Sequence, residues 1–229
     1  MKVLAIETSC EHASIALLSA GEVLERTLEG HANHSEKILA EIARLLADSG
    51  IAVGQLDALA FGSGPGAFTG LRLACGVVQG LALGSGVGIA SVSSLAALAL
   101  QAPAGRVMAA TDARMSEVYH CAFELRDGMP IACSEMACCA PEQVLLPDGD
   151  WFAIGSAFAA YDAELTRRLS GRWSGVAAAA VPRAGDVARL ATRQVGDGLL
   201  LPPERAVPLY VRDKVALTTA ERLARGGKA

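Results

Sequence analysis

Residues 2–28, KVLAIETSCEHASIALLSAGEVLERTL, hold three short apolar runs separated by turns. Lys2–Glu7 predicts a β-strand, and the polar turn Thr8–His12 connects it to a second predicted strand over Ala13–Ser19. A tight link then leads to a third predicted strand over Glu22–Leu28. The stretch therefore predicts an antiparallel meander at the start of the chain.

Helices and strands alternate after this meander. Asn33 and Glu36 have the spacing of a capping box, and the apolar stripe that follows them predicts a helix that ends at Gly50. Three antiparallel strands followed by alternating elements are typical of a mixed sheet with helices on its faces, the ribonuclease-H-like arrangement of the α/β class. The later elements are predicted as a strand over Leu56–Phe61, a glycine-rich loop over Gly62–Gly70, a helix over Leu71–Leu83, a strand over Gly88–Ala90 and a helix over Ser93–Gln101.

The second half of the chain repeats this pattern weakly. A turn at Ala102–Gly105 is a plausible boundary, and Val107–Asp112 predicts a strand that ends in an acid, as Lys2–Glu7 does. We therefore expect two related domains, residues 1–103 and 104–229, with the final helix packing back on the first. Further elements are predicted as strands over Glu117–Leu125, Ile131–Met136 and Trp151–Ile154, and a helix over Ala157–Leu169.

Length limits the number of domains, and net charge argues against one class of function. The chain has 229 residues, with 20 basic and 24 acidic side chains, so its net charge is −4. This length suits one large domain or two small ones, and either can bury a core without disulfides or metals. A protein that binds nucleic acid alone usually presents a basic face, so the charge argues against that function.

Cysteine and histidine spacing predicts no metal site. The six cysteines form no Cys-x-x-Cys pair, and the four histidines are not spaced with them as zinc ligands are. His31 and His34 precede the first helix as a pair that either binds a metal or is simply solvated. The plain interpretation is a cytoplasmic protein with reduced thiols and no secretory leader.

One long uncharged stretch has the length of a membrane span. No charged residue lies between Arg72 and Arg106. Glycines and serines interrupt this stretch repeatedly, and no aromatic residues flank it. We therefore expect a helix, a turn, a strand and a second helix, all buried within the fold.

The glycine-rich loop between a predicted strand and a predicted helix allows two interpretations. Glycines let backbone N–H groups approach an anion at a helix N-terminus, but they also permit a tight crossover that binds nothing. No Lys-Ser/Thr pair follows, and the glycine spacing does not match a dinucleotide fingerprint. The residues of interest are Gly64, Pro65, Gly66, Phe68, Thr69, Gly70 and Arg72.

Polar residues lie at the end of the first strand of each half. Glu7, Thr8 and Ser9 lie at the end of the first strand, and Asp112 and Arg114 hold the equivalent place in the second half. Ligands favour the carboxyl ends of strands in sheets of this class, so these residues are candidates for one cleft between the domains. The alternative is that they form ordinary surface turns. No complete catalytic set is present.

Three glycines recur every fourth residue on the helix predicted over 71–83. Gly76, Gly80 and Gly84 each cost about 1 kcal/mol in helix propensity relative to alanine. Close approach of another helix offsets this cost. That helix belongs either to the same domain or to another subunit.

Four motifs in order carry a family resemblance. They are AIETS at residues 5–9, GPGAFTGLR at 64–72, DAR with EVY over 112–119, and PLYVR at 208–212. Over most of its length the chain resembles the TsaB (YeaZ) family of bacterial tRNA threonylcarbamoyladenosine biosynthesis proteins. The resemblance implies two ribonuclease-H-like domains of the actin/Hsp70-like ATPase superfamily. It also implies a role in placing a threonylcarbamoyl group on N6 of the adenosine beside the tRNA anticodon.

The resemblance also implies partners. A separate enzyme makes the acyl-adenylate donor, the larger paralogue TsaD carries out the transfer, and the ATPase TsaE is the third member. The metal-binding His-x-x-x-His pair of the paralogue falls here at Ser94 and Leu98, which are not metal ligands. We therefore expect a non-catalytic partner subunit that binds no cofactor tightly, pairs with itself when alone and reaches tRNA only through the complex.

The resemblance also implies which surface pairs. Members of the family pair with themselves or with the paralogue through the helices that are predicted here over 35–49 and 71–83. The expected interface residues are Ile38, Ile42, Leu45, Leu73, Gly76, Gly80 and Gly84. The rival interpretation is an ATP-dependent phosphotransferase or hydrolase working in the cleft, to which the older name glycoprotease for some relatives belongs. Glu7 and Asp112 alone are too few acids for confident Mg-ATP binding.

Overall fold

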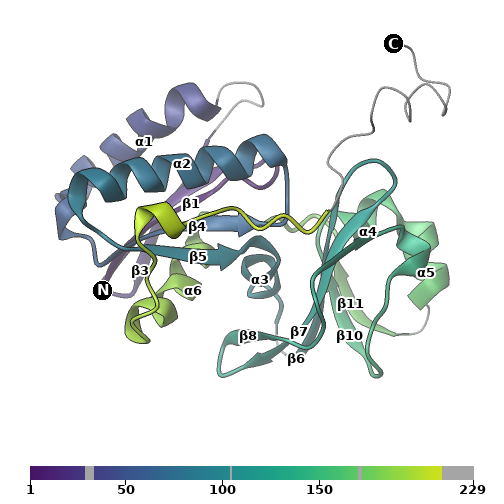
Figure 1. The fold of residues 1–229 in the computed structure, drawn as a ribbon. Coiled ribbons are helices and arrows are strands. Elements are labelled where there is room, and N and C mark those ends of the chain that lie inside the picture. The colour runs from purple at the N-terminus through teal and green to yellow at the C-terminus, as the bar shows by residue number, and fades with distance from the viewer. Residues whose placement is uncertain (29–33, 104, 170–171, 213–229) are drawn as a thin grey trace, which may run out of the picture.

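The computed structural model describes residues 1–28, 34–103, 105–169 and 172–212, which fold into two lobes (Figure 1). The first lobe is built on a five-stranded sheet with the order β3-β2-β1-β4-β5. β1 is antiparallel to β2 and parallel to β4, and Ala5 on β1 pairs with Ala16 on one side and Ala60 on the other. The strands are β1 (Lys2–Glu7), β2 (Ser14–Ser19), β3 (Glu22–Thr27), β4 (Ala58–Gly64) and β5 (Ile89–Ser93), so the predicted meander is confirmed.

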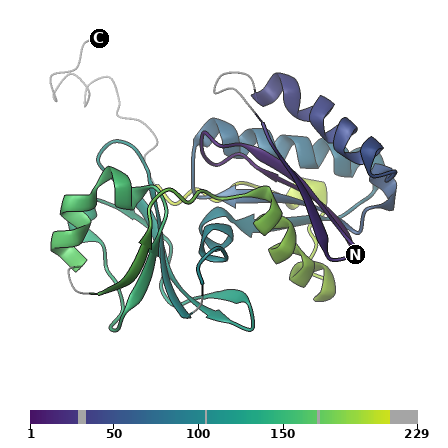
Figure 2. The ribbon, with the colours of Figure 1, turned by 180° about the vertical axis from the view of Figure 1, so that it is seen from behind.

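Successive side chains along each strand point to opposite faces of this sheet, and both faces are buried. Leu4 and Ile6 point toward the helices α1 (His34–Asp48) and α2 (Phe68–Ser85). Val3 and Ala5 point the other way, against the helix α6 (Ala184–Gly196). Figure 2 shows α6 on the face opposite to α1 and α2. The small alanines on the second face let α6 lie close to the strands.

The second lobe repeats the topology of the first. Its sheet has the order β11-β10-β6-β7-β8, and β9 pairs with β7. As β1 does in the first lobe, β6 pairs with one antiparallel and one parallel neighbour. Both lobes are therefore ribonuclease-H-like domains with mixed sheets flanked by helices. The strands are β6 (Gly105–Asp112), β7 (Val118–Arg126), β8 (Met129–Ala132), β9 (Ala137–Cys139), β10 (Trp151–Ile154) and β11 (Trp173–Ala177).

The second half differs from the prediction in four elements. The helix expected over Ala157–Leu169 is two helices, α4 (Ala157–Ala160) and α5 (Asp162–Leu169), because Tyr161 leaves the helical conformation with φ −132°. The strand expected over Ile131–Met136 is instead β8, which begins at Met129 and ends at Ala132. The strands β9 and β11 were not predicted. The short helix α3 (Ser94–Ala99) joins the two lobes, and three 3₁₀ turns lie at Val53–Gln55, Pro141–Gln143 and Pro203–Arg205.

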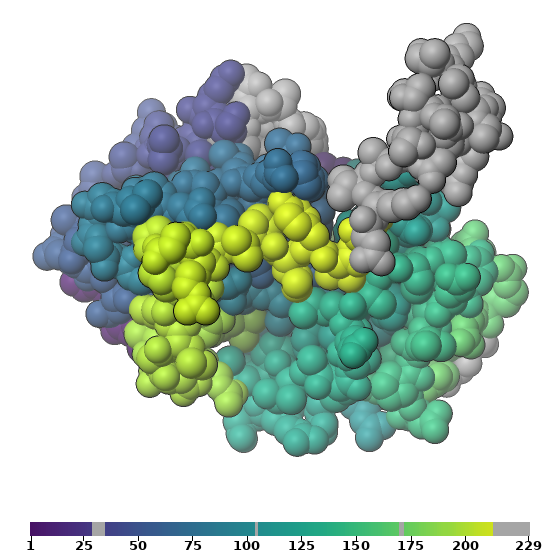
Figure 3. Space-filling view, in the orientation of Figure 1, coloured from purple at the N-terminus to yellow at the C-terminus, as the bar shows by residue number. Residues whose placement is uncertain are grey.

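The chain returns to the first lobe after the second sheet. Beyond α6, Leu201 forms an isolated bridge with Ile89 at the edge of the first sheet. The segment then runs along the surface of the first lobe toward the second, as the yellow atoms in Figure 3 show. Within the part of the chain that the structure describes, no helix combines the length and apolarity that crossing a membrane requires.

Candidate functional site

The first turn of the chain is built on a buried carboxylate. Glu7 at the end of β1 is fully buried. Its Oε1 accepts a hydrogen bond from the Ser9 N–H at 2.6 Å, and its Oε2 accepts one from the Ser94 hydroxyl at 2.8 Å. Burial raises the pKa of Glu7, and these hydrogen bonds oppose the increase. The expectation that Glu7 faces the cleft is wrong, because the chain folds over this side chain.

Thr8 is also buried, and it ties the first turn to α2. Its hydroxyl donates a hydrogen bond to the Gly70 carbonyl at 2.7 Å. Thr8 therefore does not line the cleft as expected. Its hydroxyl holds the first turn of α2 against the end of β1.

The loop predicted over Gly62–Gly70 is shorter in the structure, because β4 extends to Gly64 and α2 begins at Phe68. The glycines of the predicted loop make room for backbone. A Cβ on Gly66 would lie 2.5 Å from the Ser9 carbonyl oxygen, and one on Gly70 would overlap the Thr8 carbonyl. The Ala67 N–H donates to the Ser9 carbonyl at 2.7 Å. Gly64 has φ +114°, and a Cβ there would lie 2.9 Å from the Leu209 carbonyl oxygen. The loop is thus packed on other segments of the chain, which favours the tight-crossover interpretation.

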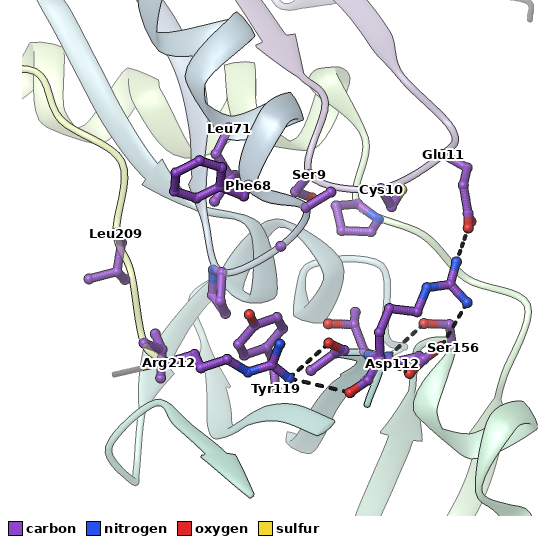
Figure 4. Close-up of a pocket in the computed structure, with 18 of the residues that line it drawn as sticks. Ser9, Cys10, Glu11, Phe68, Leu71, Asp112, Tyr119, Ser156, Leu209 and Arg212 are labelled. Carbon is purple, nitrogen blue, oxygen red and sulfur yellow. Dashed lines mark hydrogen bonds and ion pairs between the residues drawn. The ribbon is translucent and has the colours of Figure 1, made fainter. Parts of the chain in front are cut away.

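A cavity of about 580 Å³ lies between the lobes (Figure 4). Ser9, Asp112 and Arg114 all line it, so three of the five residues expected at a shared cleft do meet there. Sequence reasoning did not place the aromatic and C-terminal residues in this cavity. The additional lining residues include Cys10, Glu11, Phe68, Leu71, Tyr119, Ser156, Leu209, Tyr210 and Arg212.

Carboxylates already neutralise both arginines of the cavity. Arg114 forms ion pairs with Asp112 at 3.1 Å and with Glu11 of the first lobe. Arg212 forms an ion pair with Glu117 at 2.6 Å. A multiply charged anion entering the cavity would therefore compete with carboxylates for each cation.

The turn that carries Arg114 has an unusual backbone. Arg114, Met115 and Ser116 have φ values of 61°, 56° and 59°, a left-handed conformation that is strained in residues other than glycine. Arg212 holds this turn, because its Nη2 donates to the carbonyls of Ala113 at 2.9 Å and Arg114 at 3.3 Å. Arg212 is the last residue of the PLYVR motif, so this motif is the sequence signal that could have identified it as a cavity residue.

Burial disfavours the thiolate form of Cys10, the cysteine that lines the cavity. Burial raises the pKa of Cys10 to about 11, so its thiol stays protonated near neutral pH. Among the described residues, no group of three or more His, Cys, Asp and Glu side chains could hold a metal ion. His31, Asn33 and the side chain of His34 lie outside the described part, so the candidate histidine pair and the predicted cap are not placed.

A groove of about 420 Å³ runs over the outer surface of α1 and α2. A Cβ on Gly76, Gly80 or Gly84 would meet no atom within 4 Å, so no described segment of the chain packs on this glycine ridge. Leu39 and Leu83 beside it are 57% and 76% exposed. The residues that line the groove are Leu39, Arg72, Leu73, Gly76, Val77, Gly80 and Leu81.

The residues expected to form an interface on α1 need correction. Ile38, Ile42 and Leu45 are buried against the first sheet, with exposed fractions of 0%, 2% and 0%. The apolar stripe of α1 therefore faces the core of its own lobe. Leu39, one position along, is the α1 residue that lines the groove, together with Leu73, Gly76 and Gly80 of α2, and Gly84 is exposed beyond it.

Comparisons with known proteins identify relatives along nearly the whole chain. Residues 28–227 match the family model described as TsaD, tRNA N6-adenosine threonylcarbamoyltransferase. The tRNA threonylcarbamoyladenosine biosynthesis protein TsaB of Haemophilus influenzae is 34% identical over 94% of this chain and 95% of its own length. TsaB of Escherichia coli is 34% identical over 94% and 96%. The solved structure of YeaZ from Pseudomonas aeruginosa is 38% identical, with a TM-score of 0.84 over 91% of this chain and 99% of that one.

Proposed function

The chain belongs to the TsaB (YeaZ) family of tRNA threonylcarbamoyladenosine biosynthesis proteins, and we propose that it acts there as a non-catalytic partner subunit. In this role it binds the paralogous transferase TsaD and, with the ATPase TsaE, activates threonylcarbamoyl transfer to N6 of the adenosine beside the anticodon. Alone it pairs with a second copy of itself, and it meets tRNA only within the complex. Its compartment is the cytoplasm.

The observation that carries this proposal is the open glycine ridge. Glycine within a helix costs about 1 kcal/mol relative to alanine, and nothing in the described chain packs on Gly76, Gly80 or Gly84 to offset that cost. The half-buried side chains of Leu73, Val77 and Leu81 continue the ridge. A helix of another subunit can approach such a surface closely and bury apolar area there.

The positions that correspond to the transferase's metal ligands support the absence of catalysis. Ser94, at the start of α3, is fully buried, and its hydroxyl donates a hydrogen bond to the Glu7 carboxylate. Leu98 is fully buried in the core between α3 and the second sheet. Both side chains have structural roles, so we propose that this chain binds no metal or nucleotide tightly and that both belong to its partners.

The rival function, an ATP-dependent phosphotransferase or hydrolase in the cleft, receives less support. Glu7 is not available to a ligand in the cavity, which leaves Asp112 and Glu11 as its lining acids. Both contact Arg114. Tight binding of ATP by the isolated chain, measured by calorimetry, would favour this rival.

A drop-out reconstitution tests the proposal. Labelled threonine, bicarbonate, ATP, tRNA, the adenylate-forming enzyme, TsaD and TsaE are combined with and without this chain. We expect label in tRNA only when the chain is present, and no label when the chain replaces TsaD. Equal labelling without the chain would refute the proposed role.

Two matched variants locate the required surface in the same assay. Leu39→Glu places a charge in the groove, whereas Leu199→Glu places one at a site outside it that is 61% exposed. We expect Leu39→Glu to abolish labelling and Leu199→Glu to retain it. Equal activity of the two variants would show that the groove is not the required surface.

A further inference from the structure

The segment Pro203–Arg212, here called the strap, lies along α2. The Gln79 side chain donates to the Pro203 carbonyl at 3.1 Å and to the Ala206 carbonyl at 3.0 Å. Further along, the Leu209 N–H donates to the Ser63 carbonyl at 2.8 Å. The helix that carries the glycine ridge therefore also holds the strap.

Arg72 connects the groove to the cavity. It lines the groove, and its guanidinium carbon lies 3.9 Å from the centre of the Phe68 ring. Its Nε donates to the Tyr210 hydroxyl at 3.0 Å, and the Phe68 and Tyr210 rings lie 5.4 Å apart. Phe68 and Tyr210 both line the cavity between the lobes. One arginine side chain is thus shared by the surface proposed for the partner and the wall of the cavity.

The far end of the strap holds the second lobe. Arg212 binds the carbonyls of Ala113 and Arg114 and pairs with Glu117. The same left-handed turn carries Arg114, whose guanidinium pairs with Glu11 of the first lobe. A displacement of Tyr210 would therefore be transmitted, two residues later along the strap at Arg212, to the turn that bridges the lobes.

We propose that docking of the paralogue on the groove is coupled, through Arg72, Tyr210 and the strap, to a firmer hold on the turn at residues 113–117 that bridges the lobes beside the cavity. This inference rests on the proposed function, because it takes the groove as the docking surface. A partner that covers Arg72 removes water from its guanidinium, and the contacts of that group with the Phe68 ring and the Tyr210 hydroxyl then strengthen. The strap is held more firmly, and Arg212 in turn holds the bridging turn. Such coupling is reciprocal, so a firmly held bridging turn also favours docking.

Hydrogen exchange on the full chain tests this coupling. Exchange is followed by mass spectrometry at residues 113–117 and 209–212, with and without saturating TsaD, and binding is measured on the same samples by calorimetry. For the wild-type chain we expect TsaD to slow exchange at both segments by about fivefold or more. If TsaD binds the chain but leaves the exchange rate at residues 113–117 unchanged, the coupling is overturned and the proposed function stays intact. Failure of the wild-type chain to bind TsaD would overturn the proposed function and the coupling together.

Two variants interrupt the path at different points. Tyr210→Phe keeps the ring and removes the hydroxyl that Arg72 contacts; we expect it to bind TsaD with at most about fivefold weaker affinity and to show no slowing at 113–117. Arg212→Gln interrupts the far end, so binding should slow exchange at 209–211 but not at 113–117. Slowing at 113–117 equal to the wild type in both variants would overturn the inference. Unchanged melting temperatures of the free variants exclude unfolding as the cause.

Discussion

The carboxylate of Glu7 occupies the space in which a side chain on Gly62 would begin. The two residues follow Ile6 and Phe61, which pair across the parallel strands β1 and β4. A glycine at this position of β4 therefore has a specific cause. The buried acid needs the space, and its two hydrogen bonds fix the turn beneath the cavity.

The first prediction concerns Gly62→Ala. The added methyl group overlaps the Glu7 carboxylate, and overpacking of this kind typically costs about 1–3 kcal/mol. We expect urea denaturation to show a loss of unfolding free energy of this size. The double variant Glu7→Ala/Gly62→Ala removes the collision, so its loss should be smaller than the sum of the two single losses. Additive losses would contradict the proposed overlap.

The second prediction concerns the pH dependence of stability. Burial raises the pKa of Glu7 above its value in the unfolded chain, so the folded state binds the proton more tightly. This contribution to stability is complete below the unfolded pKa and is lost as the pH rises through the folded pKa. Glu7→Gln keeps the shape without the ionisation, so its melting temperature should fall less than that of the wild type as the pH rises toward 8.

The comparison between wild type and Glu7→Gln isolates this group. Burial also raises the pKa of Asp186, which changes stability in the same direction but is present in both proteins. Parallel curves of melting temperature against pH would show that Glu7 does not titrate as its surroundings indicate.

The third prediction concerns thiol reactivity. Burial raises the pKa of Cys10 and Cys121 to about 11, which keeps both thiols protonated at pH 8. Cys133 is exposed. Brief treatment with iodoacetamide at pH 8, followed by peptide mapping, should therefore find Cys133 modified before Cys10 and Cys121. Earlier labelling of Cys121 would contradict the burial of the second sheet.

Sequence periodicity predicted strands well where a strand has its own apolar pattern. Lys2–Glu7 in the first sheet and Trp151–Ile154 in the second form strands with the predicted bounds. The strand β11 carries a weaker signal, because Gly175 interrupts its five residues and its burial alternates only between half-buried and exposed. Its backbone pairs with the edge of β10, a tertiary interaction that no local pattern contains.

The candidate site was also predictable only where a local pattern places the residue. Asp112 and Arg114 reach the cavity because they lie at the end of β6, at the lobe boundary. Glu7 ends β1 in the same way, but Gly62 and Ser94, far along the chain, enclose it. On α1, helical spacing identified an apolar stripe, but it did not show that the stripe faces the core and leaves Leu39 outside.

The last prediction concerns Gly80→Leu. The Cβ position of Gly80 is open, and leucine is a better helix former than glycine, so the variant should fold with unchanged or slightly higher stability, by up to about 1 kcal/mol. A partner helix packed on the ridge would collide with the new side chain. We therefore expect analytical ultracentrifugation to show loss of self-pairing and of binding to TsaD.

Gly196→Leu is the matched control for this variant. Gly196 is also helical and exposed, with nothing within 4 Å of its Cβ position, but it lies on α6 on the opposite face of the first sheet. Both substitutions add the same apolar side chain at an exposed helical position, although Gly196 is the last residue of α6 and gains less in helix propensity than Gly80 in the middle of α2. Loss of pairing in Gly80→Leu alone would therefore result from contact with the ridge. Retained pairing in Gly80→Leu would show that the interface lies on another surface.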